Sequence, residues 1–576
     1  MKRSLIIVIF LIQQIFSQNI TNTLGNLGKF RIKDNSTTFL SLDQSTGNLN
    51  FNGNLILPNS FSSNTGIIMK GNYSFIHDFS QFGSIGDNLF VGERSGNFTL
   101  TNSANYNTGL GYSTLMDLTT GSNNTAVGSN SLLNNTSGTY NTATGSGTLY
   151  FNTTGSYNIA IGSNALYSNI SGVNNTSAGY ESLLLNTTGS RNSAYGNKSL
   201  HQNTTGNNNS AFGSFSLRFN TTGSENSVFG YYSMEKNTTG QQNSAFGSTS
   251  MQDNTTGSYN CAFGDQSLTG NTSGVENSAF GFAVLMYNTT GNNNSAFGSG
   301  SMQFNTTAVE NSGFGANTMH NNTTGNFNAA IGTNALYYNT TGGGNTAIGS
   351  YSMSGNTTGT VNTVVGHQAA TNLVSGNNNT LIGYDAEPTI PSINNQITLG
   401  NNQITSLRCN VTTITSLSDA RDKKNIQDLN LGLGFISKLK PRIYNWDKRE
   451  WYENNVSDGS KMQLLPTAGF IAQELDEAQT SENAEWLNLV LKDNPEKLEA
   501  TTGNLLPVMV KAIQELKAEN DLLKEENTSI SAEYESLKQE NSKLSSRVEI
   551  IEDILKTKLS MVSIEVKNTM EPENVK

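Results

Sequence analysis

Residues 209–223 read Asn-Ser-Ala-Phe-Gly-Ser-Phe-Ser-Leu-Arg-Phe-Asn-Thr-Thr-Gly, and units of this kind start at every seventeenth position along the chain. Leu or Met follows the central glycine by four residues, from Leu115 through Met353, and Ala usually precedes it by two. Constant spacing is the sequence mark of a solenoid, in which each turn stacks on its copy. The glycine recurs without insertion or deletion at positions 111, 128, 145, 162, 179, 196, 213, 230, 247, 264, 281, 298, 315, 332, 349, 366, 383 and 400.

The unit is too short for a pair of helices, and its Gly and Asn-Thr-Thr-Gly punctuation favours short strands. Residues 59–387 contain no Pro, which suits a ladder of paired backbone amides. One turn per repeat, at ~4.8 Å, predicts a rod on the order of 80 Å long with the Leu/Met and Ala columns inside. One large apolar side chain per turn is a thin core, which favours association of several chains over a lone solenoid.

The fold class expected is therefore mostly β, with a β-solenoid or β-roll stalk over residues 111–400. The Asn-Ser-Ala-Phe-Gly-Ser style of the unit resembles the β-roll heads of trimeric autotransporter adhesins and the repeats of phage-type tail fibres. The resemblance lies in the style of the unit and does not extend to its period.

The Asn of each Asn-Thr-Thr-Gly segment starts an Asn-x-Ser/Thr sequon, which predicts glycosylation in a eukaryotic secretory pathway. The alternative is that Asn and Thr form hydrogen-bonded stacks along the solenoid. Adjacent Thr residues point to opposite sides of a strand, which argues against an ice-binding face. The candidate glycosylation sites are Asn135, Asn152, Asn186, Asn203, Asn220, Asn237, Asn254, Asn271 and Asn288.

A catalytic site within the repeats is not expected. Residues 101–400 hold only ten Asp/Glu, scattered over different repeat columns, and glycosidase chemistry needs two carboxylates about 5–9 Å apart. The four His residues also occupy unrelated positions, and the expectation for them is a surface location on the solenoid. These are His77, His201, His320 and His367.

Charge is concentrated toward the C-terminus: residues 401–576 hold 22 of the 33 Lys/Arg and 29 of the 44 Asp/Glu. The net charge of −11 and the lack of a basic stripe in the first 400 residues argue against nucleic acid as a partner. Cys261 and Cys409 match no metal or redox spacing and are interpreted as incidental. No cofactor and no metal are expected. All three Trp lie in the charged part, where a packed core is expected.

The N-terminus predicts a secreted protein. Residues 1–17 combine Lys2 and Arg3 with a short apolar run and a small residue at Ser17, the pattern of a signal peptide. A membrane anchor is the alternative, although the apolar run is shorter than the ~20 residues that a bilayer requires. Residues 18–110 alternate apolar and polar positions and are expected to form short strands of a cap or attachment segment.

Four motifs follow residue 400 in order. They are Ser418-Asp-Ala-Arg-Asp-Lys-Lys-Asn-Ile426, Gly434-Phe-Ile-Ser-Lys-Leu-Lys-Pro-Arg-Ile-Tyr-Asn-Trp446, Gly469-Phe-Ile-Ala-Gln-Glu-Leu475 and Leu506-Pro-Val-Met-Val-Lys-Ala-Ile-Gln-Glu-Leu516. This order resembles the endosialidase-type intramolecular chaperone, a serine self-peptidase family of phage tail spikes that also occurs in myelin regulatory factor proteins. The resemblance covers about residues 415–555, and every fixed position of Ser-Asp-x-Arg-x-Lys-x-x-Ile is present.

The resemblance implies a small α+β domain over 418–512 that assembles as a homotrimer and cuts its own chain between Leu417 and Ser418. Ser418 is then the nucleophile and Lys423 the general base, while Asp419 and Arg421 support the turn. Residues 401–417 become the linker to the cut. No His follows His367, so a Ser-His pair is excluded here. A domain that assembles without cutting remains the alternative.

Residues 513–555 predict a coiled coil, because apolar residues and Asn alternate at spacings of three and four over six heptads. A single amphipathic helix packed on its own domain is the alternative, and residues 556–576 are expected to be a flexible tail. One core position holds Ile513, Asn520, Asn527, Tyr534, Asn541, Val548 and Leu555; the other holds Leu516, Leu523, Ile530, Leu537, Leu544 and Ile551.

The function that these parts favour is a secreted structural or adhesive fibre, assembled as a homotrimer, whose partner is a cell-surface or glycan ligand. A receptor-binding or glycan-degrading fibre like a tail spike is the second hypothesis. A processed transcription factor like the myelin regulatory factor proteins is disfavoured, because a DNA-binding domain before the motif and a membrane span after it are missing from the sequence.

Overall fold

The computed structural model describes residues 29–33, 38–43, 48–52, 57, 59–60, 66–81, 86–404, 406–408 and 418–568. The predicted signal peptide, Cys409 and the Leu417 side of the predicted cut lie outside these residues. The chain divides into two units, Met1–Ile404 and Thr405–Lys576.

The first unit begins with a small antiparallel sheet of β1 (Lys29–Lys33), β2 (Thr38–Asp43) and β3 (Leu49–Phe51). A second antiparallel pair, β4 (Ile68–Lys70) and β5 (Tyr73–His77), joins the first strand of the solenoid through β5. Short strands therefore lie where the alternating pattern predicts them.

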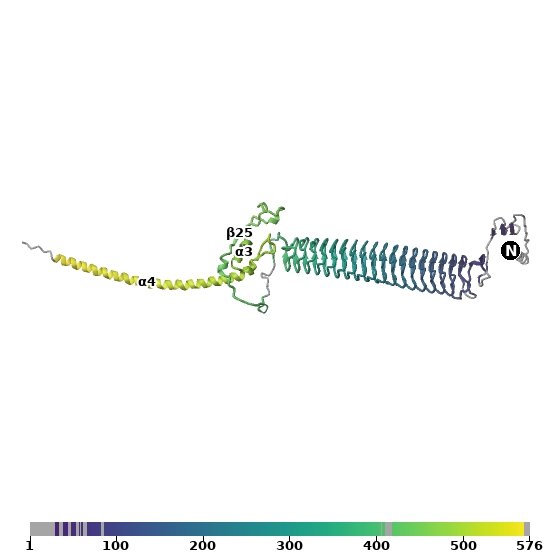
Figure 1. The fold of residues 1–576 in the computed structure, drawn as a ribbon, viewed down its shortest axis with the longest axis horizontal. Helices are drawn as coiled ribbons and strands as arrows, with labels where there is room; N and C mark the ends of the chain where they lie inside the picture. The colour runs from purple at the N-terminus through teal and green to yellow at the C-terminus, as the bar shows by residue number, and fades with distance from the viewer. Residues whose placement is uncertain are drawn as a thin grey trace, which may run out of the picture. The chain divides into compact units, whose positions relative to one another are not determined.

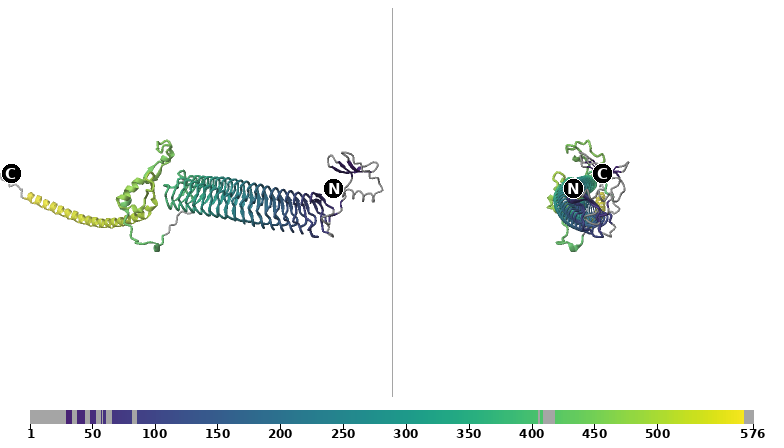
Figure 2. Two further views of the ribbon diagram at one scale, coloured as in Figure 1. Left: turned by 45° about the vertical axis from the view of Figure 1, so that its right-hand side comes forward. Right: turned by 90° about the vertical axis from the view of Figure 1, so that its right-hand side faces the viewer.

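The rest of the unit is a regular stack of coils, each contributing one short strand to a continuous parallel sheet (Figures 1 and 2). From β7 onward each strand pairs with the strand of the next coil at the spacing of the repeat, as Ala211 does with Val228. The coil between β6 and β7 is longer than those that follow, since Phe90 pairs with Gly109. That longer coil hides the first turn of the solenoid from a search for a strict period.

The strands are Leu89–Val91 (β6), Thr108–Leu110 (β7), Thr125–Val127 (β8), Thr142–Thr144 (β9), Ile159–Ile161 (β10), Thr176–Ala178 (β11), Ser193–Tyr195 (β12), Ser210–Phe212 (β13), Ser227–Phe229 (β14), Ser244–Phe246 (β15), Cys261–Phe263 (β16), Ser278–Phe280 (β17), Ser295–Phe297 (β18), Ser312–Phe314 (β19), Ala329–Ile331 (β20), Thr346–Ile348 (β21), Thr363–Val365 (β22), Thr380–Ile382 (β23) and Ile397–Leu399 (β24).

The glycine that follows each strand is required by both its backbone and its neighbours. Gly213 has φ +132°, a conformation that side chains disfavour, and a Cβ there would lie 2.4 Å from the carbonyl oxygen of Gly230. Successive coils therefore touch backbone to backbone along this row. The row explains why the glycine spacing admits no insertion.

The Leu/Met column is buried, as the sequence predicts, but in an unexpected conformation. These side chains are fully buried, while their φ angles lie between +48° and +53°. A left-handed residue other than Gly costs about 1–3 kcal/mol. Burying a Leu or Met side chain contributes about 1.5–3 kcal/mol, which is enough to offset that strain.

Two columns of buried Asn complete the core. In one column, Asn220 Nδ2 donates to Asn203 Oδ1 at 2.8 Å and to the Gly223 carbonyl at 2.9 Å. In the other, the backbone N–H and Nδ2 of Asn209 both donate to Asn192 Oδ1, at 3.0 and 3.2 Å. We call these columns the asparagine ladders. Hydrogen-bonded in this way, a buried amide avoids the penalty of lost water contacts.

The ladders correct one expectation from the sequence. The Leu/Met, Ala and both Asn positions of a coil such as Asn209–Gly223 are all fully buried within one chain. The interior is therefore closed without a partner, because polar ladders fill the section that the apolar column leaves open. A thin core is not a reason for the solenoids to associate.

The second unit is a small α/β domain followed by a long helix (Figure 1). Its β-strands form two antiparallel pairs, β25 with β26 and β27 with β28. The elements are η1 (Ala420–Asp422), α2 (Leu433–Ile436), β25 (Arg442–Tyr444), η2 (Arg449–Trp451), β26 (Thr467–Gly469), α3 (Ala472–Ser481), η3 (Glu485–Leu487), β27 (Val490–Leu491), β28 (Glu499–Ala500), η4 (Thr502–Leu505) and α4 (Leu506–Asn568).

The core of this domain lies between α2, α3 and the first turns of α4, and its central residues include Phe435, Leu475 and Val508. Glu515 on α4 holds the start of α2, because its carboxylate accepts the Leu433 N–H at 2.7 Å. The three Trp were expected in a packed core. In this chain Trp446 and Trp486 are exposed and Trp451 is half-buried, so that expectation is wrong for the single domain.

Helix α4 spans 63 residues and continues through 556–568, part of the segment assigned above to a flexible tail. Its predicted seam is exposed at every apolar position, for example 63% at Ile513 and 54% at Leu544. The helix predicted by the heptads is present, and its pairing with other helices stays a prediction. None of the helices in the described ranges combines the length and the apolarity needed to cross a membrane.

One histidine departs from the expected surface location. His77 on β5 is 2% exposed and lies between the rings of Phe90 and Phe98, with centroids 4.9 and 4.8 Å away. Its Nε2 lies 2.7 Å from the Ser95 carbonyl oxygen, and the Phe79 N–H donates to Nδ1 at 3.4 Å. These partners assign a neutral ring with its proton on Nε2.

We expect the N-terminal end of the solenoid to weaken as pH falls. Burial lowers the pKa of His77, against smaller opposing effects of the Ser95 carbonyl and Asp78. The unfolded state then binds more protons than the folded one, so stability is present above about pH 6.5 and is lost as pH drops below it. Hydrogen exchange of the β5 and β6 amides, corrected for intrinsic rates, measures this loss. A His77→Gln variant with the same pH slope would contradict the assignment to His77.

Candidate active site at Ser418 and Lys423

The motif serine and lysine are brought together by a single turn of 3-10 helix. η1 (Ala420–Asp422) lies between them, and the Lys423 N–H donates to the Ala420 carbonyl at 3.2 Å to close the turn. Lys423 Nζ then lies 2.5 Å from Ser418 Oγ. A separation of five residues thus becomes a direct contact between the predicted nucleophile and the predicted base.

This contact distinguishes the two neighbouring lysines, which the sequence separates by motif spacing alone. The hydrogen bond to Ser418 comes from Lys423, while Lys424 is the next residue along and is exposed. We call Ser418 and Lys423 the dyad.

Asp419 and Arg421 stiffen the turn that carries the dyad. The Asp419 carboxylate accepts the backbone N–H of Arg421 at 2.9 Å. The Arg421 guanidinium also donates to it, from Nε at 3.0 Å and from a terminal nitrogen at 2.6 Å. The Arg421 hydrogen bonds lower the pKa of Asp419, and the carboxylate raises the pKa of Arg421. The pair therefore stays charged at neutral pH, and its place in the turn suits a supporting role.

The dyad is open to water in the single chain. Every residue from Ser418 to Asp428 is exposed. A lysine accepts a serine proton at neutral pH only where burial or neighbouring cations favour its neutral form. Arg421 is a neighbouring cation, but Asp419 neutralises it. The single chain thus brings the two candidate groups into contact without burying them.

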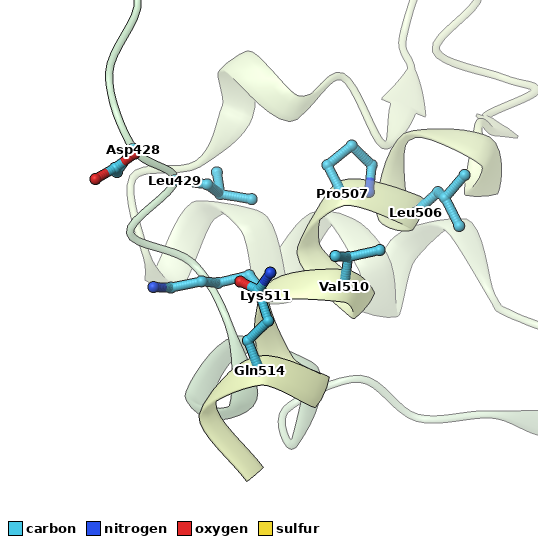
Figure 3. Close-up of a pocket in the computed structure, with 7 residues that line it drawn as sticks. All are labelled: Asp428, Leu429, Leu506, Pro507, Val510, Lys511 and Gln514. Atoms are coloured by element: carbon cyan, nitrogen blue, oxygen red, sulfur yellow. The ribbon is translucent and has the colours of Figure 1, made fainter. Parts of the chain in front are cut away.

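A shallow groove lies where the segment after the motif meets α4, and sequence reasoning gave no indication of it. It has a volume of about 560 Å³ (Figure 3). Apolar side chains of Leu429, Leu506 and Val510 line it, with Lys511 and Asp428 at the edge. The amphipathic start of the Leu506–Leu516 motif is the only sequence signal that relates to it.

The predicted glycosylation sites lie inside the solenoid. All nine Asn side chains are fully buried, and Nδ2 is the atom that would carry a glycan. In eight of them Nδ2 donates as described for Asn220, while Asn135, at the start of the column, donates to the Gly138 carbonyl alone. A glycan would replace one N–H of Nδ2 and would have to occupy the closed interior. The stacking interpretation of these residues therefore accounts for their burial.

Ion pairs on the solenoid join an acidic residue to a Lys or Arg of the adjacent coil. Glu181 lies 3.4 Å from Lys198, Glu235 lies 3.4 Å from Arg218, and Asp253 lies 2.7 Å from Lys236. Ion pairs of this kind are structural, and none of them sets two carboxylates face to face across a groove.

Residues 418–483 match a protein-family model described as chaperone of endosialidase. The match begins at the dyad serine and runs through α3, which confirms the resemblance for that segment. In the sequence it is preceded by a solenoid whose row of glycines marks 18 turns and ends at Gly400. No curated protein matches the chain.

Proposed function

We propose that this chain is a tail-fibre-like structural or adhesive protein whose solenoid stalks are aligned by the C-terminal chaperone in a homotrimer. We also propose that the chaperone then cuts its own chain before Ser418. The observation that carries this proposal is the family match at 418–483, which begins at a serine held 2.5 Å from a lysine.

Assembly is supported by the apolar surface that the second unit leaves uncovered. Ile443, Leu464 and Leu465 are exposed by 80%, 92% and 81%, and the α4 seam is exposed along its length. An exposed helix of this length does not gain stability from packing on its own domain. Copies that pair along α4 would bury the seam, and three copies follow the family's association with trimeric fibres.

Enclosure by neighbouring copies gives the dyad the conditions that the single chain lacks. Once neighbouring copies shield the dyad from bulk solvent and leave room for single water molecules, neutral Lys423 accepts the proton of Ser418 Oγ, and the oxygen attacks the carbonyl carbon of residue 417. The peptide C–N bond breaks, and the proton passes to the new amino group of Ser418. Water then hydrolyses the ester between residue 417 and Ser418 Oγ, which frees both fragments and restores the hydroxyl.

A chaperone that works only in the assembled state fits the stalk that precedes it. Each coil pairs only with its neighbours one repeat away, so folding can start at any coil, and stalks that are not aligned with one another are prone to assemble out of register. A coiled coil that forms first would set a common register for the stalks, and a cut that waits for enclosure would report that assembly is complete.

Secretion and the state of the sequons belong to the same proposal. The signal-peptide pattern at 1–17 and the fibre-like stalk support an extracellular location. Because the nine candidate Asn side chains are buried in the ladder, we propose that they remain unmodified in the folded stalk.

The mass of the purified full-length product tests this function. We expect a particle of three copies, and a C-terminal fragment that begins at Ser418 and ends at Lys576. Peptide masses should show bare Asn at the ladder positions. An uncut monomer would contradict both assembly and processing, whereas an uncut trimer would leave only the assembly role.

A further inference from the structure

A column of stacked aromatic rings runs along the outer face of the solenoid sheet. Each ring belongs to the residue just before a row glycine, and neighbouring ring centroids lie 4.5–5.1 Å apart with planes within 2–11° of parallel. We call this column the aromatic stripe. Its members are Tyr195, Phe212, Phe229, Phe246, Phe263, Phe280, Phe297 and Phe314.

Aliphatic residues continue the stripe toward both ends. Ile161 precedes it, and Ile331, Ile348 and Ile382 follow it, each between 40% and 49% exposed. The other outward position of each strand, two residues earlier, is mostly Ser or Thr. Strands β6 to β24 contain no charged residue at all. Charge-free, aromatic surface is the composition of an interface core and is unusual for a face left in water.

The stacking of the rings limits the kinds of ligand that this face could bind. Sugars and flat ligands use the open face of an aromatic ring, but both faces of every ring between Tyr195 and Phe314 are covered by the rings of the coils before and after it. Mainly ring edges therefore reach the surface: Phe229 and Phe263 are 37% and 36% exposed, and the other inner rings are more deeply buried. The edges form an apolar ridge that suits another packed protein surface.

The regular repeat indicates which protein supplies the partner surface. Ridges recur at the coil spacing of ~4.8 Å, so a partner that fits along the whole stripe must share this spacing. A second copy of this chain, running in the same direction, does. The small Ser/Thr column beside the stripe allows two sheets to approach to the ~10 Å that sheet packing needs.

We propose that the aromatic stripe is the surface along which the solenoids of one assembly pack against one another. This inference rests on the proposed assembly of copies and specifies the stalk surface that it uses. From Ile161 to Ile382 the stripe and its aliphatic continuation span ~62 Å at ~4.8 Å per coil, so a strip ~10 Å wide covers on the order of 600 Å² per copy. That is below the ~800 Å² share per partner of a standard interface, and pairing along α4 would add to it.

The chain carries its own reporter for this contact. Cys261 occupies the Ser/Thr position of β16, two residues before Phe263 on the same face, and is half-buried. In the full-length protein with Cys409→Ser, Cys261 is the only cysteine. A short bismaleimide should then link chains into covalent pairs, because a two-ended reagent joins only two thiols. The control places the cysteine elsewhere on the coil, as Thr256→Cys with Cys261→Ser and Cys409→Ser; Thr256 is exposed on the Asn-Thr-Thr-Gly segment.

The outcomes separate this inference from the function it rests on. Linked pairs through Cys261, and none above the reagent-free background through Thr256→Cys, are the expected result. A particle with the mass of a trimer whose Cys261 does not link would overturn the stripe as the contact while leaving the trimer intact. A particle with the mass of a monomer would overturn the assembly itself.

A charged residue placed in the aromatic stripe provides a second test of the proposed contact between stalks. Phe280→Lys should separate the stalks while α4 still holds the copies together, so that the particle keeps its mass but becomes wider in solution scattering. Thr290→Lys, on an exposed Thr of the next Asn-Thr-Thr-Gly segment, is the matched control and should leave the dimensions unchanged. Circular dichroism of both variants verifies that the coils remain folded. Equal dimensions for the two variants would count against the stripe.

Discussion

We expect that replacing Ser418 by Ala leaves the chain uncut, so that the C-terminal fragment proposed for the wild-type protein, which would begin at Ser418, does not form. The variant lacks the oxygen that attacks the preceding carbonyl, and Lys423 Nζ is left with no hydroxyl 2.5 Å away. We expect complete loss of the cut, measured by denaturing electrophoresis and by N-terminal sequencing of any fragment. Assembly should persist, since the α4 seam and the domain core are unchanged.

Substitutions at the lysines sharpen the same result. Lys423→Arg keeps the positive charge but cannot give up its proton, so the serine remains protonated and the cut is lost. Lys424→Ala removes the neighbouring charge and should slow the cut modestly at most. If Lys423→Arg still yielded a fragment beginning at Ser418, the proposed role of Lys423 as base would be wrong.

Deleting residues 513–576 should abolish assembly. The deletion removes the exposed α4 seam and also Glu515, whose carboxylate accepts the Leu433 N–H, but it keeps the apolar core residues around Phe435 and Val508. We expect monomers with an uncut chain, because separate copies cannot enclose the dyad. Sedimentation or light scattering measures the mass, and electrophoresis measures the cut.

A shorter deletion provides the control for that experiment. Removing only residues 569–576 leaves α4 intact to its last residue, Asn568. This deletion should change neither the number of copies in the particle nor the cut before Ser418. A trimer that forms without residues 513–576 would show that α4 is not the alignment device. In that case the exposed Leu464 and Leu465 of the domain would become the surfaces to test.

Sequence pattern predicts most of the solenoid, because its key positions repeat. The glycine row at Gly213, the buried Leu217 and the inward Ala211 all follow from the constant period and from elementary sterics. The stacking of Asn220 on its copies also follows from the repeat, as the alternative to glycosylation, but its full burial does not, since a lone Asn is normally a surface residue. It becomes a core residue only because a copy one coil away satisfies its amide.

The candidate site shows the same division between local and distant causes. Motif spacing singles out Ser418 and Lys423, and one turn of helix brings them into contact. Exposure of that turn could not be read from the motif, because burial depends on what surrounds the chain. The exposed Trp446 and Trp486 show the same division: their residue type suggests a core position, but the sequence does not say whether their own domain buries them.

The direction of the bonds between coils determines how a stalk of this kind responds to a mechanical load. Hydrogen bonds of the sheet and of the asparagine ladders run along the solenoid axis, so tension between its two ends stretches them directly. Because each coil is held mainly by its neighbours, the coils are released one at a time. A released coil extends to about 58 Å, against ~4.8 Å when stacked. Under tension the stalk would therefore lengthen roughly tenfold per coil and dissipate work in small steps, where a rigid rod would detach or break.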